Sequence, residues 1–280
     1  MAAIRLGLIG DNIRESRSPD LHRLAGAMTG LDVSYDLLIP AEMGMGFKEV
    51  FAACRDRAMT GVNVTLPYKE RVVEMVRVDD PAIARIGSVN TVTFASGGAR
   101  GFNTDYSGFV SAYRQAFGDA APGRVALIGA GGVGRAIAFG LLALGAAEIV
   151  LIDTDRARAG VLAAALSAAG VAPVRVAGPE ALPGADGVVN ATPLGMVGYP
   201  GSPVPEGAFP KGSWAFDAVY TPVATPFRTQ ALAAGARFLS GWELFFFQGV
   251  DAFALFTGRR PDDLMQLRAA LRDPRLHPVV

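Results

Sequence analysis

Short apolar runs alternate with amphipathic stretches through the first hundred residues of the chain. Four runs of strand length cover residues 4–9, 35–39, 61–66 and 88–94, and the amphipathic stretch 42–57 lies between two of them. Short apolar runs bounded by turn-forming residues are typical of buried strands, whereas apolar positions three or four residues apart are typical of helices. The alternation predicts an α/β fold in which helices cover a mostly parallel sheet.

A more regular pattern begins at Gly123. The stretch RVALIGAGGVGRAIAFGLLALGAAEIVLID combines a strand, a glycine turn, a helix and a second strand within about thirty residues, as in a βαβ unit. An alanine-rich helix is expected near residues 159–169, and strand-like runs follow at 187–190, 214–219 and 236–239. This second part of the chain is therefore expected to form a Rossmann dinucleotide-binding fold.

The length of 280 residues allows two domains. A strongly apolar helix is expected from residue 242 to 257, and Pro261 marks a break before a last helix. We expect a first domain of residues 1–104, completed by the C-terminal helices 245–280, and a Rossmann domain of residues 105–244.

Charge, cysteine and histidine content narrow the class of protein. The chain carries 26 basic and 26 acidic side chains, which gives no reason to expect a nucleic acid or an anionic membrane as partner. The single cysteine, Cys54, cannot form an internal disulfide, as is usual in a reducing compartment. With His22 and His277 as the only histidines, a histidine-based metal site is not expected.

Membrane and export signals are also not expected. The N-terminal apolar run is interrupted by Asp11 too early for a secretory signal. The most apolar region, ELFFFQGVDAFALF, carries Glu243, Gln248 and Asp251, so it is too polar to span a bilayer. The sequence predicts a soluble, cytoplasmic protein.

A glycine-rich loop joins the first strand and helix of the predicted Rossmann fold. The pattern G-x-G-x-x-G lies there in the strand–turn–helix context that makes it informative. The first glycine permits a tight turn, the second lets a pyrophosphate approach the backbone, and the third lets helix and strand pack closely. The helix N-terminus offers free amides to the phosphates. A turn without a ligand is the alternative; otherwise we expect contacts with a dinucleotide at Gly129, Ala130, Gly131, Gly132, Val133 and Gly134.

The end of the second Rossmann strand bears on the choice of cofactor. Asp153 lies 24 positions after Gly129, close to the spacing at which an acidic side chain accepts the ribose hydroxyls of NAD. Asp153 and the nearby Asp155 would repel the 2'-phosphate of NADP, so NAD is the expected cofactor. Arg156 or Arg158 could instead bind that phosphate, which leaves NADP as the alternative.

Several motifs occur in order along almost the whole chain. They are SRSPDLH at 16–22, NVTLPYKE at 63–70, GSVNT at 87–91, GFNTDYSG at 101–108, GAGGVG at 129–134, NATPLGM at 190–196, DAVY at 217–220 and the helix that contains Gln248. Together they resemble the shikimate dehydrogenase family, most closely its NAD-preferring quinate/shikimate dehydrogenase branch. The resemblance implies hydride transfer between a nicotinamide cofactor and carbon 3 of shikimate or quinate.

The resemblance implies a catalytic pair. Lys69 matches the family's catalytic lysine, and Asp105 matches its acidic partner in the N-T-D motif. Reduction of a ring ketone requires a proton for the developing alkoxide, and a lysine beside a carboxylate can hold and exchange it. Which of the two carries the proton is left open. Taken alone, Lys69 would be an ordinary surface lysine after a strand end.

The resemblance also implies ligands for a polyhydroxylated carboxylic acid. Ser16 and Ser18, two positions apart in an extended segment, are expected to point the same way and match the family's carboxylate ligands. Ser18 could also be a helix N-cap before Pro19. His22 matches a histidine expected to be structural. The other implied positions are the hydroxyl ligands Thr65, Asn90 and Gln248, the carboxylate-side Tyr220, and the cofactor contacts Asp153, Thr154, Arg158, Thr192, Met196, Val219 and Gly241.

Two departures from the family pattern bear on cofactor and substrate. Thr154 stands where NADP-using members carry an arginine, which favours NAD. Phe245, Phe246 and Phe247 follow Leu244 and add apolar bulk, which either packs a core or reshapes the pocket near carbon 1 of the ring. Because no extra polar residue is available for the additional hydroxyl of quinate, we expect shikimate to be the better substrate.

The sequence leaves two alternatives to the function that the resemblance implies. One is an enzyme like methylenetetrahydrofolate dehydrogenase, which the serine pair and the N-T-D motif argue against. The other is a non-catalytic sensor that binds the same ligands, which the Lys69 and Asp105 pair argues against. The expected partner is a small molecule, with no nucleic acid or membrane, and the protein is expected to be a monomer or a homodimer.

Overall fold

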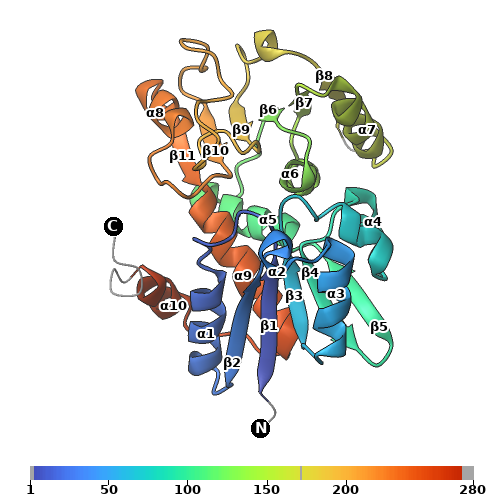
Figure 1. Cartoon of the computed structure of the whole chain (residues 1–280). Helices are drawn as coiled ribbons and strands as arrows, with labels where there is room; N and C mark the ends of the chain where they lie inside the picture. The colour runs from blue at the N-terminus through green and yellow to red at the C-terminus, as the bar shows by residue number, and fades with distance from the viewer. Residues whose placement is uncertain (1–2, 171, 273–280) are drawn as a thin grey trace. The chain divides into compact units, whose positions relative to one another are not determined.

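The computed structural model describes residues 3–170 and 172–272, and its chain divides into two compact units. Unit 1 comprises Met1–Thr104 and Phe246–Val280, and unit 2 comprises Asp105–Phe245. The chain passes from one unit to the other within two helices, α5 (Thr104–Phe117) and α9 (Gly241–Thr257). Figure 1 shows the elements of each unit.

Unit 1 is built on a five-stranded sheet with the order β2-β1-β3-β4-β5. The first three strands run parallel to one another, and β4 is antiparallel to both of its neighbours. The strands predicted from the first four apolar runs are confirmed, although the bounds of β2, β3 and β4 differ from the predicted ones by one to three residues. The bounds are β1 (Ile4–Ile9), β2 (Val33–Leu38), β3 (Gly61–Val64), β4 (Thr91–Ala95) and β5 (Gly98–Phe102).

Helices cover both faces of this sheet because alternate strand residues point to opposite sides. On one face, Leu6 and Tyr35 belong to a buried cluster with Ala252 and Phe256 of α9. On the other face, helix α3 buries its apolar side in a second cluster. The remaining helical elements of unit 1 are α1 (Ser18–Met28), α2 (Pro40–Met43), α3 (Phe47–Asp56), the 3₁₀ turn η1 (Arg71–Met75), α4 (Pro81–Ile86) and α10 (Leu264–Leu271).

Unit 2 is a six-stranded parallel sheet with the order β11-β10-β9-β6-β7-β8. The strand order reverses between β6 and β9, which is the switch point of the classic dinucleotide-binding fold. The Rossmann prediction is therefore confirmed at the level of the fold. The strands are β6 (Arg124–Ile128), β7 (Glu148–Ile152), β8 (Val174–Val176), β9 (Gly187–Asn190), β10 (Trp214–Asp217) and β11 (Arg237–Ser240).

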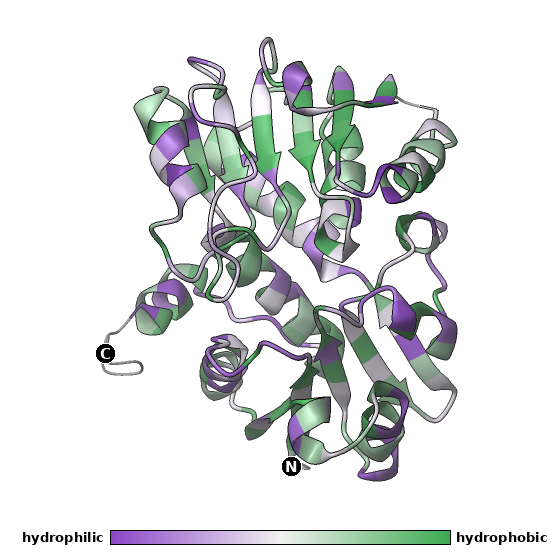
Figure 2. Ribbon diagram, turned by 45° about the horizontal axis from the view of Figure 1, so that its top comes forward, coloured by the Kyte–Doolittle hydropathy of each residue, from purple (hydrophilic) through white to green (hydrophobic). Residues whose placement is uncertain are grey.

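The strands of unit 2 are hydrophobic over most of their length, as Figure 2 shows, because helices lie on both faces of a parallel sheet. Ala126, Val150, Val188 and Ala215 from neighbouring strands are fully buried in one cluster together with Phe227 of α8. The helical elements are α6 (Gly132–Ala143), α7 (Arg156–Ser167), the 3₁₀ turn η2 (Pro179–Ala181) and α8 (Pro226–Ala233).

Some elements differ from the sequence-based expectation. The amphipathic stretch 42–57 is interrupted, because Gly44 takes a left-handed conformation (φ 63°) that ends α2. The strands β5 and β8 were not expected. Ser18 is not the cap of α1, since Arg17 occupies that position and Ser18 is the first helical residue.

Within residues 3–170 and 172–272, no helix is long and apolar enough to cross a membrane. The same residues contain no group of three or more histidine, cysteine or acidic side chains that could hold a metal ion. His277 lies outside the described residues.

Candidate active site and dinucleotide site

Lys69 lies on a turn that follows β3 at the carboxyl end of the unit 1 sheet. The backbone N–H of Thr65 donates to the Ile9 carbonyl at 2.9 Å, and the N–H of Tyr68 donates back to the Thr65 carbonyl at 2.9 Å. The carbonyl of Lys69 accepts from the N–H of Val89 at 2.8 Å. The turn is thus bonded on both sides to neighbouring segments, and Lys69 is half-buried.

Ser16 and Ser18 lie on the segment between β1 and α1. The Ser16 hydroxyl donates to the Ser18 hydroxyl at 3.1 Å, and the backbone N–H of Ser18 donates to the Ser16 hydroxyl at 3.3 Å. The two hydroxyls are therefore adjacent, but the expected extended segment is wrong, since Arg17 between them has φ −86° and ψ 4° and Ser18 begins α1. Arg17 occupies the cap position of α1 without a side-chain capping bond, and Ser16 accepts only the N–H of Ser18, the first helical residue.

Asn90 is 3% exposed and belongs to a buried network of polar side chains. Its Oδ1 accepts from the backbone N–H of Thr104 at 2.7 Å, and its Nδ2 donates to Gln248 Oε1 at 3.4 Å. Since a backbone N–H can only donate, the Asn90 oxygen must face Thr104 and its amide nitrogen must face Gln248. The structure brings these two predicted hydroxyl ligands together.

Residues beneath Asn90 complete the network. The Thr91 hydroxyl donates to Asn90 Oδ1 at 3.1 Å and accepts from Asn63 Nδ2 at 3.0 Å, and the Tyr35 hydroxyl donates to Asn63 Oδ1 at 2.9 Å. Thr91, Asn63 and Thr104 were not among the residues predicted for the site. The signal that could have found them is their place inside the same short motifs as Lys69, Asn90 and Asp105.

Asp105 lies in the first turn of α5 and is 4% exposed. A carboxylate there is favoured by the positive end of the helix dipole. The N–H that precedes it in the chain, that of Thr104, is the one held by Asn90. The start of the helix that carries Asp105 is therefore fixed by a predicted substrate ligand.

His22 is buried and makes aromatic contacts. Its ring stacks on Tyr35 with centroids 4.7 Å apart and lies beside Phe253 and Phe256. Burial lowers the pKa of His22 to about 3, and a hydrogen bond with the Asn63 side chain only partly offsets this effect. The imidazole stays neutral at physiological pH, which agrees with a structural role.

The glycine loop of unit 2 lies between β6 and α6, at the switch point. Gly129 has φ 102°, a conformation that glycine adopts without strain. A side chain at Gly134 would collide with the Gly129 carbonyl, whereas one at Gly131 would have no neighbour closer than Arg158 Nη1 at 4.0 Å. The loop is thus tight at its first and third glycines and open at its second, which fits the approach of a pyrophosphate.

Asp153 follows β7 and is joined to the glycine loop. Its Oδ2 accepts from the backbone N–H of Ala130 at 2.7 Å, and its Oδ1 accepts from that of Asp155 at 2.8 Å. Asp155 caps α7 by accepting from the N–H of Arg158 at 3.0 Å. Two carboxylates therefore stand beside the loop, and exposed Thr154 lies between them in the chain.

The loop after β9 adjoins the glycine loop, and the loop after β10 lies against Gly241. The Thr192 hydroxyl donates to Asn190 Oδ1 at 2.7 Å, and Ala191 lies against Gly129. A side chain at Gly241 would come within 2.5 to 2.7 Å of the backbone after β10, so this position requires the close approach of glycine. Met196 is half-buried in the loop after β9, and Val219 is buried after β10.

Asp217 at the end of β10 was not predicted as a site residue, although the DAVY motif contains it. It is fully buried and accepts hydrogen bonds from Asn190 at 2.9 Å, from the Val219 N–H at 3.1 Å and from Thr225. Burial raises the pKa of Asp217 to about 6 despite these bonds. Its contacts join the end of β9 to the loop between β10 and α8.

The phenylalanine run divides between two environments. Phe246 is fully buried, and the Arg268 guanidinium lies 4.1 Å from its ring centroid. Phe245 stacks on Tyr220 with centroids 5.0 Å apart. Phe246 is therefore core, and Phe245 fixes the ring of Tyr220.

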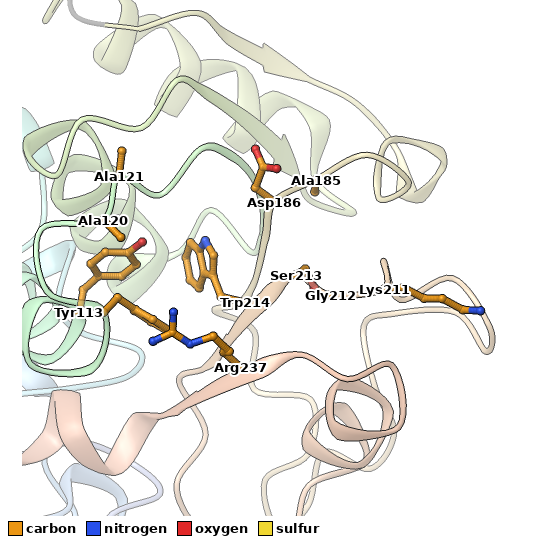
Figure 3. Close-up of a pocket in the computed structure, with 11 residues that line it drawn as sticks. Tyr113, Ala120, Ala121, Ala185, Asp186, Lys211, Gly212, Ser213, Trp214 and Arg237 are labelled. Carbon is orange, nitrogen blue, oxygen red and sulfur yellow. The ribbon is translucent and has the colours of Figure 1, made fainter.

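A separate cavity of about 250 Å³ opens where β9, β10 and β11 begin, at the other end of the strands from the glycine loop. Tyr113, Trp214 and Arg237 lie together in it, whereas Lys211 points away from them (Figure 3). None of the predicted site residues lines it.

Comparison with known proteins finds one family model that matches unit 1 and one that matches unit 2. A family model described as "Shikimate dehydrogenase substrate binding domain" matches residues 8–92, and one described as "NADP oxidoreductase coenzyme F420-dependent" matches residues 124–198. A shikimate dehydrogenase (NADP(+)) of Streptomyces avermitilis is 40% identical over 270 residues, which cover 94% of this chain and 93% of the relative.

Two further relatives carry NAD, rather than NADP, in their names. A quinate/shikimate dehydrogenase (NAD(+)) of Corynebacterium efficiens is 38% identical over 93% of this chain and 95% of its own. The solved quinate dehydrogenase of Corynebacterium glutamicum, in complex with NAD, superposes with a TM-score of 0.86 and 34% identity over 96% of this chain and 98% of its own. Dehydrogenases of this kind are oxidoreductases that bind a dinucleotide.

Proposed function

The chain belongs to the shikimate dehydrogenase family, and we propose that it transfers hydride reversibly between NAD and carbon 3 of shikimate, with 3-dehydroshikimate as the oxidised product. One observation carries the proposal. Asn90 and Gln248 are hydrogen-bonded to each other, and the turn that carries Thr65 and Lys69 is bonded to Ile9 and Val89 in the same unit. Unit 1 would bind the substrate and unit 2 the dinucleotide.

The polar groups of unit 1 suit a polyhydroxylated carboxylic acid. The adjacent hydroxyls of Ser16 and Ser18 would bind the carboxylate, with Tyr220 as a further contact there. Thr65, Asn90 and Gln248 would bind ring hydroxyls. Because the Asn90 oxygen is occupied by Thr104, Asn90 would act through its N–H₂ group as a donor.

Lys69 and Asp105 would handle the proton. Oxidation of the hydroxyl requires removal of its proton as hydride leaves carbon 3, and reduction requires the reverse. A half-buried lysine on a turn bonded to both neighbouring segments is well placed to keep a fixed position during that transfer. Acid–base catalysis of this kind contributes roughly 10²- to 10⁴-fold to the rate.

The residues of unit 2 fit a dinucleotide, because the space over Gly131 is open and the amides at the start of α6 face it. When bound, NAD supplies the hydride acceptor. The loop from Gly129 to Gly134 would hold the pyrophosphate and Asp153 the adenosine ribose. The loops with Thr192, Met196, Val219 and Gly241 would line the rest of the dinucleotide site.

A preference for NAD over NADP is supported by charge. Both oxygens of Asp153 are held by backbone N–H groups, so its charge stays where a 2'-phosphate would have to sit. Thr154 offers no positive charge to such a phosphate. Arg158, whose guanidinium lies near Gly131, would then face the pyrophosphate rather than a 2'-phosphate.

Steady-state kinetics with shikimate and quinate test the proposal. With NAD at saturation, we expect a higher kcat/KM for shikimate, because no polar side chain beyond the shared ligands is available for the extra hydroxyl of quinate. A clear preference for quinate would contradict the substrate assignment. Absence of turnover with either acid would contradict the proposed function and favour a non-catalytic sensor. Family membership argues against the methylenetetrahydrofolate dehydrogenase alternative.

A further inference from the structure

A hydrogen bond between Tyr68 and Asp11 links two segments that carry proposed active-site residues. We propose that Tyr68 and Asp11 are positioning residues, which hold the turn of Lys69 in register with the segment that leads to Ser16 and Ser18. This inference rests on the proposed function. Neither residue would touch the reacting atoms.

The link itself is short and has little freedom. The Tyr68 hydroxyl donates to Asp11 Oδ1 at 2.6 Å. Beside it, the backbone N–H of Asp11 donates to the Leu66 carbonyl at 3.2 Å, and Gly10 lies so close to Thr65 that a side chain there would collide. Residues 10–11 therefore contact residues 65–68 through backbone and side chains. The bond between Tyr68 and Asp11 is the side-chain part of this contact.

The ring of Tyr68 is held in place from the other side. It is 7% exposed and stacks on Phe47 with centroids 4.4 Å apart and an interplanar angle of 3°. The Arg71 guanidinium lies 5.4 Å from the Tyr68 centroid and 5.8 Å from that of Phe47. Stacking fixes the ring, and the hydroxyl is thereby aimed at Asp11.

The chemistry of the bond suits positioning more than stability. Asp11 is exposed, so water would solvate its carboxylate if the bond were lost, and the net contribution to folding is small. Burial and the bond to Asp11 raise the pKa of Tyr68 above its usual value, so the hydroxyl remains a donor throughout the neutral range. What the bond fixes is the distance between the Lys69 turn and the serine segment.

Four single variants separate this role from a purely structural one. Tyr68→Phe keeps the stacked ring and removes the donor, and Asp11→Ala removes the acceptor. Asp11→Asn keeps an acceptor oxygen and is the rescue variant. Tyr113→Phe is the matched control, since the Tyr113 hydroxyl makes no hydrogen bond to the described residues and lines the cavity at the other end of the unit 2 strands.

The measurements are kcat and KM for shikimate, and amide hydrogen exchange of residues 64–69 without substrate. We expect Tyr68→Phe and Asp11→Ala each to lower kcat/KM roughly tenfold, the factor expected for one lost hydrogen bond to a carboxylate, through both a lower kcat and a higher KM. Their double variant should lose no more than either alone. Exchange at 64–69 should become faster. Asp11→Asn and Tyr113→Phe should match the wild type.

Wild-type kinetics and exchange in Tyr68→Phe would overturn the proposal, and so would an Asp11→Asn variant as impaired as Asp11→Ala. Should Tyr68→Phe fail to fold, Asp11→Ala at its exposed position carries the same test. If the wild type turned over neither acid, the proposed function would fail, while the exchange comparison would still decide whether the Tyr68–Asp11 bond orders the turn.

Discussion

At the scale of a single residue, the proposed preference for NAD depends on Asp153. Its carboxylate is fixed by two backbone N–H groups and cannot swing away from a 2'-phosphate without breaking both bonds. In the proposed site, repulsion between this charge and a 2'-phosphate of nearly two charges would oppose the binding of NADP.

We expect kcat/KM to favour NAD over NADP by at least about tenfold, the effect of one such unfavourable charge contact. The double variant Asp153→Ala with Thr154→Arg removes the repulsion and adds a guanidinium, so it should narrow or reverse the preference. Steady-state kinetics with NAD and with NADP measure the ratio of the two kcat/KM values. An unmodified enzyme that prefers NADP would show that Arg156 or Arg158 binds the phosphate instead.

Short motifs were enough to predict candidate site residues. They were not enough to predict how the side chains of these residues are oriented. The chain order of Lys69, Asn90 and Gln248 says nothing about which end of an amide faces the substrate. That follows from the Thr104 N–H, which is brought to Asn90 only by the fold. In the same way, the bond between Tyr68 and Asp11 joins residues 57 positions apart.

The glycine loop shows how one element can combine rigidity with an open binding surface. Gly129 and Gly134 are fixed by close approach to backbone, whereas Gly131 has extended backbone angles (φ −76°) that alanine also adopts. Folding therefore does not require glycine at position 131, whereas the proposed approach of a pyrophosphate does.

Gly131→Ala is expected to leave the unfolding temperature unchanged or slightly higher, and to raise the KM for NAD at least about tenfold because the methyl group occupies the path of the pyrophosphate. Gly160→Ala is the matched control. Gly160 lies in α7 with open space around it, so alanine there should stabilise by about 0.5–1 kcal/mol and leave the KM unchanged. A wild-type KM for NAD in Gly131→Ala would contradict the role of the loop.

Elements with a strong apolar signal were predicted and weaker ones were not. The strands β6 and β7, for example, each end in four consecutive buried apolar residues. In contrast, β5 has the sequence GARGF with exposed positions, and it exists because it pairs with β4 after a turn at Gly98 (φ 101°). The three-residue β8 is an edge strand with little buried surface. Such strands depend on a partner that the local sequence does not reveal.

At the scale of the whole molecule, the two units carry buried groups that respond to acid in opposite ways. His22 in unit 1 has a folded-state pKa of about 3, below its unfolded value of 6.5, so its stabilising contribution is complete above pH 6.5 and is lost as the pH falls toward 3. Asp217 in unit 2 has a folded-state pKa of about 6, above its unfolded value of 3.8, so unit 2 gains stability as the pH falls from 6 toward 3.8.

We therefore expect acid to unfold unit 1 before unit 2. Both tryptophans, Trp214 and Trp242, lie in unit 2, so their fluorescence reports that unit while circular dichroism reports both. In urea titrations the two midpoints should separate as the pH falls from neutrality to about 4.5.

Two variants serve as controls for the acid response. His22→Phe retains an aromatic ring without the titrating group and should abolish the pH dependence of unit 1. Asp217→Asn should reduce the pH dependence of the stability of unit 2. If the urea midpoints from fluorescence and from circular dichroism coincide at every pH in the wild type, the prediction that acid unfolds unit 1 before unit 2 is contradicted.

The central claim is that Lys69 handles the proton during hydride transfer, and kcat of Lys69→Ala for shikimate oxidation by NAD tests it most directly. Lys48→Ala, at an exposed position of α3 in the same unit, is the matched control and should be unaffected. We predict that kcat of Lys69→Ala falls at least about a hundredfold with the fold and the affinity for NAD unchanged. Turnover close to that of the wild type in Lys69→Ala would contradict the account.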